Sequence, residues 1–98
     1  MRVHDRTSSN LVGRVVDLTT EGMRIVSEQP VTAADALQLK MTLPVGLGAA
    51  EVAFDARAVW SGPDINPDFF DTGLKIDAIS DEGARSLERV MRLSSFRG

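Results

Sequence analysis

Residues 51–60 read EVAFDARAVW, and this stretch decides the fold class. Apolar side chains occupy every second position, and the charged residues Glu51, Asp55 and Arg57 fall on the other set of positions. The apolar positions are Val52, Phe54, Ala56, Ala58 and Trp60. A period of two is typical of a β-strand that buries one face and exposes the other. We therefore predict a strand over residues 51–61, with Phe54 and Trp60 both in the core rather than free to stack on a base.

The same pattern continues on both sides of this stretch. Residues 36–43 and 69–78 also alternate between apolar and polar side chains. Two shorter apolar runs end at turn residues and indicate two more strands. The turn-type cluster at residues 7–10 indicates a hairpin, which adds one strand at the start of the chain. The six predicted strands cover about residues 1–6, 11–17, 22–27, 36–43, 51–61 and 69–78.

The period changes after Ser80. The apolar residues that follow have helical spacing, and they are Ala84, Leu87, Val90 and Met91. Ser80 is a suitable N-cap residue, with Asp81 and Glu82 in the first turn. We predict a helix over about residues 81–94. The fold class is therefore all-β: a small six-stranded antiparallel β-barrel with one C-terminal α-helix, forming a single domain over residues 1–98.

Composition limits the classes of function. The chain has 98 residues, which is enough for one ordinary domain. It contains no cysteine, which excludes disulfides and thiolate metal sites. The net charge of −3 argues against binding a nucleic acid polymer. No apolar run reaches the ~20 residues of a membrane span, and no signal peptide opens the sequence. We expect a cytoplasmic protein.

Few residues could support catalysis or bind a metal ion. His4 is the only histidine, so neither a zinc site nor a histidine-based triad is expected. Asp64, Asp68 and Asp71 lack the spacing of a calcium loop, and we interpret them as acids of a solvated loop around an Asn66–Pro67 turn. We expect no catalytic residues, no metal and no cofactor, and hence no enzyme.

The connection between the second and third predicted strands is more informative. It reads DLTTEG from Asp17 to Gly22. On local chemistry alone it is a tight turn, in which the Asp and Thr oxygens bind nearby backbone groups. Gly22 would supply a backbone conformation that other residues resist.

Together with the order of elements, this connection resembles the PilZ domain, a bacterial receptor family for the second messenger cyclic di-GMP. The resemblance covers residues 11 to 93. The family signature Asp/Asn-x-Ser-x-x-Gly is matched by Asp17, Thr19 and Gly22, with Thr in place of Ser. Residues 64–73 also resemble a loop and strand found in part of the family.

The resemblance implies a regulatory module that binds cyclic di-GMP and signals through a protein partner, which the sequence does not identify. It assigns ligand binding to Asp17, Thr19 and Gly22. An Asp carboxylate can accept hydrogen bonds from the guanine N1–H and N2–H₂ groups, and a hydroxyl can reach phosphate or base. Glycine permits close approach of the backbone.

The family also has an Arg-x-x-x-Arg segment before its first strand, and Arg2 and Arg6 match its letters. Here residues 1–6 are themselves a predicted strand, so the two arginines would stand roughly 13 Å apart on one barrel wall. In that position they could not wrap around a ligand. Two functions therefore stay open. The chain is either a cyclic di-GMP receptor module or a degenerate PilZ-like adaptor that binds only proteins.

Overall fold

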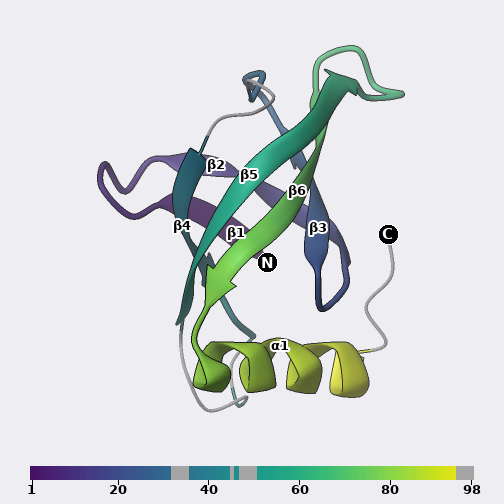
Figure 1. Cartoon of the computed structure of the whole chain (residues 1–98). Helices are drawn as coiled ribbons and strands as arrows, with labels where there is room; N and C mark the ends of the chain where they lie inside the picture. The colour runs from purple at the N-terminus through teal and green to yellow at the C-terminus, as the bar shows by residue number, and fades with distance from the viewer. Residues whose placement is uncertain (32–35, 45, 47–50, 95–98) are drawn as a thin grey trace.

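Six antiparallel strands close into a barrel in the computed structural model, which describes residues 1–31, 36–44, 46 and 51–94 (Figure 1). The elements are β1 (Arg2–Asp5), β2 (Leu11–Leu18), β3 (Gly22–Ser27), β4 (Ala36–Thr42), β5 (Glu51–Pro63), β6 (Phe70–Ile79) and α1 (Asp81–Ser94). Their order around the barrel is β1-β2-β3-β6-β5-β4, and pairing of β1 with β4 closes it. The predicted fold class is confirmed.

The core lies inside the barrel and under the helix. Figure 1 shows α1 lying across one end of the barrel. Leu87 and Val90 of α1 are fully buried and belong to the same apolar cluster as the inward side chains of the strands. Phe54 is 1% exposed, as its place in the alternating pattern of β5 predicts.

Several β-bulges interrupt the alternation, and two of them, one in β2 and one in β5, determine which side chains face outward near Asp17 and Trp60. Val15 pairs with Ile25 and Asp17 pairs with Arg24, so Val16 is an extra residue in β2. Val59 is likewise an extra residue in β5. After such a bulge, every following side chain lies on the face of the sheet opposite to the one that strict alternation predicts. Asp17 is therefore exposed, while the next residue in the chain is buried.

The bulge at Val59 shows that the core position predicted for Trp60 is wrong. The Trp60 side chain is 46% exposed on the outside of the barrel. Strict alternation would have turned it inward, but the extra residue reverses its direction. The structure thus places an indole ring on the outer surface, where a ligand or a partner can reach it.

Ser80 caps the helix, as its sequence position predicts. Its Oγ accepts a hydrogen bond from the Gly83 N–H at 3.0 Å, and its carbonyl accepts one from the Ala84 N–H at 2.9 Å. Ser80→Ala is expected to lower the free energy of unfolding by about 1 kcal/mol, because the Gly83 N–H loses its partner. For a domain of this size the melting temperature should fall by roughly 4–8 °C.

Thermal unfolding followed by circular dichroism measures this effect. Thr20→Ala is a matched control, because the exposed Thr20 side chain has no hydrogen bond among the described residues. Equal melting temperatures for the two variants would contradict a stabilising role for the cap.

Candidate functional site

A shallow pocket of about 480 Å³ lies on the outer surface of the barrel, where β3, β6 and β5 run side by side. Residues predicted for ligand binding share this pocket with an aromatic side chain and two cations. The lining consists of Asp17, Thr19, Glu21, Gly22, Met23, Arg24, Val59, Trp60, Gly73, Leu74 and Lys75. The structure therefore brings Asp17, Thr19 and Gly22 together, and it adds groups that the sequence did not single out.

Thr19 organises the turn between β2 and β3. Its Oγ1 accepts hydrogen bonds from the N–H groups of Glu21 and Gly22, both at 3.2 Å, and donates to the Gly22 carbonyl at 3.2 Å. The Thr19 N–H donates to the same carbonyl at 2.9 Å. A hydroxyl has one donor and two acceptor positions, so all of them are used within the turn. The hydroxyl fixes the shape of the pocket rim.

Gly22 is needed for a different reason from the one its turn position predicts. Among the described glycines only Gly46 has a positive φ, so the expected special conformation of Gly22 is wrong. Gly22 begins β3 and pairs with Lys75 of β6. A Cβ atom added at Gly22 would collide with the Leu74 carbonyl oxygen and lie 3.3 Å from the Lys75 Cα. Glycine here allows the β6 backbone to approach.

Trp60 lies flat against the neighbouring strand. It pairs with Gly73 of β6, and a Cβ atom added there would lie 2.8 Å from the Trp60 Cδ1. The missing side chain of Gly73 thus makes room for the indole, which forms one wall of the pocket. The sequence analysis placed Trp60 in the core and so missed its place in the pocket. The signal that could have revealed it is Gly73 in the next predicted strand, because aromatic side chains often cover glycines across strands.

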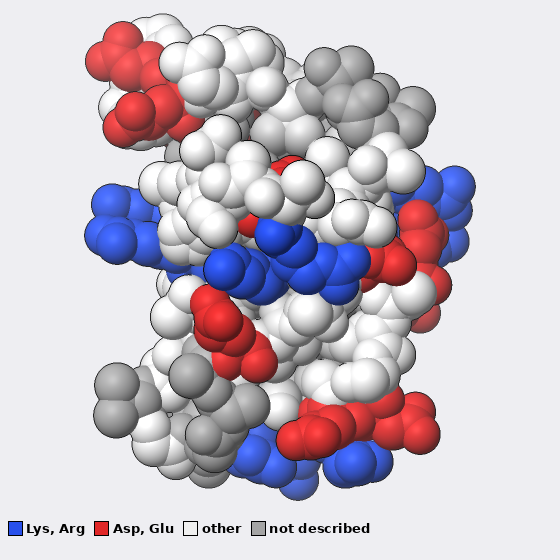
Figure 2. Space-filling model, turned by 90° about the vertical axis from the view of Figure 1, so that its left-hand side faces the viewer, with Lys and Arg blue, Asp and Glu red and all other residues white. Residues whose placement is uncertain are grey.

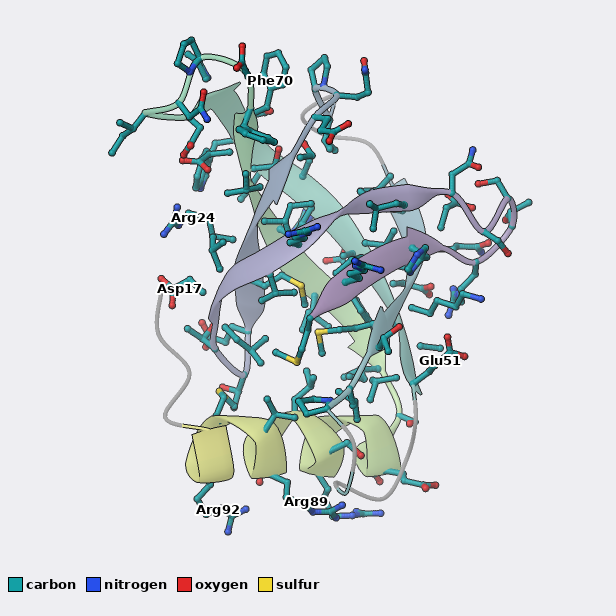
Figure 3. All side chains as sticks on the ribbon, turned by 180° about the vertical axis from the view of Figure 1, so that it is seen from behind. Asp17, Arg24, Glu51, Phe70, Arg89 and Arg92 are labelled. Atoms are coloured by element: carbon teal, nitrogen blue, oxygen red, sulfur yellow. The ribbon has the colours of Figure 1, made fainter. Side chains whose placement is uncertain are left out.

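The cations of the pocket come from β3 and β6. Arg24 lies directly opposite Asp17 in the register of β2 and β3, and Figure 3 shows both side chains projecting from the same side of the barrel. The Arg24 Nη1 lies 3.5 Å from Asp71 Oδ2. Lys75 is exposed at the edge of the pocket. The pocket therefore offers both a carboxylate and positive charge beside one aromatic ring.

Asp71 lies within β6, as the predicted strand over residues 69–78 requires, so its interpretation as an acid of the solvated loop is wrong. Its side chain is only 20% exposed, and its Oδ1 is buried without a hydrogen-bond partner among the described residues. Asp64 and Asp68 do lie in the β5–β6 connection, where the Phe69 N–H donates to the Asn66 carbonyl at 3.0 Å and confirms the predicted turn. No three of the described acidic or histidine residues are grouped to hold a metal ion.

Burial raises the pKa of Asp71, and the neighbouring Asp64 carboxyl raises it further, while Arg24 acts in the opposite direction. A raised pKa means that the folded state binds this proton more tightly than the unfolded chain. Binding of this proton therefore stabilises the fold fully below pH 3.8, the ordinary pKa of the group. This stabilisation is lost as the pH rises through the higher pKa of Asp71 in the folded state.

Asp71→Asn is expected to remove this loss, because a neutral amide stays uncharged at every pH. The variant should be more stable than the parent at pH 7, and the gain should shrink as the pH falls toward 3.8. Urea unfolding at several pH values measures the difference. Asp68→Asn, in the exposed part of the same hairpin, is the control. A gain that is independent of pH would contradict the assignment to Asp71.

Arg2 and Arg6 lie outside this pocket. Arg2 is part of β1 and pairs with Arg14. Arg6 directly follows β1, where its N–H donates to the Gln38 carbonyl at 2.9 Å and its guanidinium forms an ion pair with Asp55 of β5. On the face shown in Figure 2, basic side chains are interspersed with acidic ones. Both arginines are thus built into the barrel wall.

Comparisons with known proteins agree on the fold. The model of the PilZ domain matches residues 2–93. The solved structure of the Bacillus subtilis inhibitor of motility (MotI/DgrA) is similar, with a TM-score of 0.75 and 14% sequence identity. The match covers 98% of this chain and 47% of that one, so the chain spans about half of the length of that protein. No curated protein has a significant sequence match. Within the described residues, no helix has the length and apolar character needed to cross a bilayer.

Proposed function

Because the chain belongs to the PilZ domain family, whose members commonly bind cyclic di-GMP, we propose that its outer pocket binds this nucleotide. The observation that carries the proposal is the meeting of Asp17, Trp60 and Arg24 in one pocket. These three groups match the three chemical features of the ligand. It has guanine edges rich in donors, flat base faces and anionic phosphodiesters.

Each group has a distinct proposed role. The exposed Asp17 carboxylate accepts hydrogen bonds from the guanine N1–H and N2–H₂ groups. The Trp60 indole stacks on a base, an interaction that every base face permits. Arg24 and Lys75 contact phosphate, where charge-assisted hydrogen bonds are stronger than neutral ones. Thr19 and Gly22 shape the pocket, Thr19 through its turn and Gly22 through close strand pairing.

In this proposal Arg24 and Lys75 take over the phosphate contacts that the family's arginine segment provides. Arg24 is fixed on a strand and is already partly oriented by Asp71. A strand-borne cation loses less conformational freedom on binding than a mobile terminal segment. The pocket is then complete without Arg2 and Arg6.

The chain signals in this proposal through a protein partner and catalyses no reaction of its own, in keeping with a receptor family that is usually non-enzymatic. Ligand binding shifts the population toward the conformation that holds the nucleotide more tightly. That conformation then presents a different surface to the partner.

A second candidate function is that of a protein-interaction adaptor without nucleotide binding. The observation that favours it is the position of Arg2 within β1 and of Arg6 in an ion pair with Asp55. Two charge-assisted contacts are worth about 1.5–3 kcal/mol each, so their loss could weaken nucleotide binding by two to four decades. In this alternative the pocket has lost its ligand.

Isothermal titration of the chain with cyclic di-GMP distinguishes the two functions. The receptor proposal expects micromolar or tighter binding, no comparable binding of cyclic di-AMP, and loss of the signal in Asp17→Ala and Arg24→Ser. Asp68→Ala, outside the pocket, is the matched control. Absence of binding by a folded chain would reject the receptor proposal for this chain and favour the adaptor.

A further inference from the structure

A second hollow, of about 470 Å³, lies on the outer face of β2 and β3 beside the β5–β6 hairpin. We call it the β2–β3 groove. Its wall is mainly apolar and is formed by Leu11, Val12, Val16, Val26 and Phe69. The Leu11 side chain is 53% exposed, which is unusual for a leucine within a strand. Apolar groups gathered in an open concave site are typical of an interaction surface.

A pair of like charges lies beside this groove. Arg14 lines it, and Arg2 lies directly opposite Arg14 on the neighbouring strand. Both are exposed, and within the described part of the chain neither side chain has a hydrogen bond or an ion pair. Like charges directly opposite each other on paired strands destabilise a sheet. Among the other described cations of the barrel wall, Arg6, Arg24, Lys40 and Arg57 have acidic partners, and only Lys75 of the nucleotide pocket has none. The Arg2–Arg14 pair is therefore complementary to an external anionic group.

We propose that the β2–β3 groove and the Arg2–Arg14 pair form a docking site for a segment of a partner protein. The segment carries an apolar side chain that enters the groove and one or two adjacent carboxylates that contact the arginines. This proposal goes beyond nucleotide binding and does not require it.

The charge distribution favours a peptide over a polyanionic surface. Glu28 lines the groove as well, so an extended run of phosphates would meet repulsion at that position. A short acidic segment can place its carboxylates at Arg2 and Arg14 only. The net charge of −3 also disfavours approach to a highly anionic surface, such as nucleic acid or an anionic membrane, more strongly than approach to a segment with one or two carboxylates.

The site lies next to the nucleotide pocket. Val26 lines the β2–β3 groove, and Arg24, two residues earlier on the same outer face of β3, lines the pocket. A docked segment would therefore lie beside a bound nucleotide, on a surface that nucleotide binding can change because the two sites are adjacent.

Selection from a phage library of random 12-residue peptides on the immobilised full chain tests the proposal. We expect the selected sequences to share an apolar residue next to Asp or Glu. A synthetic peptide of the selected sequence should lose at least tenfold in affinity for Arg14→Glu and for Leu11→Ser, measured by fluorescence anisotropy.

Two controls match these changes on other surfaces. Arg85→Glu reverses a charge on the exposed face of α1, and Ile65→Ser removes an apolar side chain at the tip of the hairpin. Both should bind the peptide as the parent does, and circular dichroism should show every variant folded.

Three outcomes would overturn the proposal. The first is that the selected sequences lack the acidic–apolar pattern. The second is that the peptide still binds to both Arg14→Glu and Leu11→Ser. The third is that no peptide binds, while phosphatidylserine vesicles bind in a way that depends on Arg2 and Arg14. Cyclic di-GMP titration of Arg14→Glu separates this site from the pocket. Lost peptide binding with unchanged nucleotide binding supports the proposal. If the parent binds no nucleotide, loss of peptide binding in Arg14→Glu, with the fold intact, supports it alone.

Discussion

Trp60→Ala is expected to weaken cyclic di-GMP binding by about 5- to 150-fold while leaving the barrel folded. Stacking of one base on an aromatic side chain is worth about 1–3 kcal/mol when tested by alanine substitution. Trp60 is 46% exposed and outside the core, so its removal opens no internal cavity. Isothermal titration gives the affinity, and thermal unfolding confirms the fold.

Two further variants make this test specific. Gly73→Ala adds a methyl group where the indole rests, which should push the ring off β6 and weaken binding without removing the tryptophan. Ile65→Ala removes another exposed apolar side chain outside the pocket and should not change the affinity. If all three variants bound the nucleotide as the parent does, stacking on Trp60 would be excluded.

Gly22→Ala is expected to destabilise the fold by about 3 kcal/mol, near the upper end of the usual cost of overpacking. The added Cβ would meet the Leu74 carbonyl, a backbone atom that cannot move unless β3 and β6 separate. For a domain of this size the melting temperature should fall by roughly 12–24 °C. Calorimetry or circular dichroism measures the change.

Gly62→Ala is the matched control. Gly62 also lies in a strand, but a Cβ added there meets no atom within 4 Å. Its stability should stay within about 0.5 kcal/mol of the parent. Similar melting temperatures for the two variants would contradict the close approach at Gly22. A large difference would assign the glycine of the family signature to barrel assembly rather than to ligand contact.

The sequence predicts the barrel well because each strand depends on a local pattern. The alternation from Val52 to Ala58 places Phe54 in the core, and the change of period after Ser80 locates the helix. The pattern fails at Trp60 because a bulge depends on how β5 pairs with β6. Strand pairing is a tertiary property that a single strand does not encode.

The candidate site is predictable only in part for the same reason. The resemblance identified Asp17, Thr19 and Gly22, which are close together in the chain and line one pocket. Arg24 joins them through the β2–β3 hairpin, where it lies opposite Asp17, whereas Trp60 joins them only through the order of strands around the barrel. The low exposure of Asp71 was not predicted, because it depends on the side chains that β3 brings beside β6, Arg24 among them.

Closure of the barrel has a consequence for how partners can recognise this domain. Each of the six strands has two hydrogen-bonded neighbours, so among the described residues no strand offers an edge that is free along its whole length. Recognition by addition of a foreign strand along a whole edge, which relies on backbone atoms and tolerates many sequences, is therefore closed to this fold. A partner must read outward side chains, most of which contribute little to folding. Exchange of a few wall residues can thus change the partner during evolution while the scaffold stays intact.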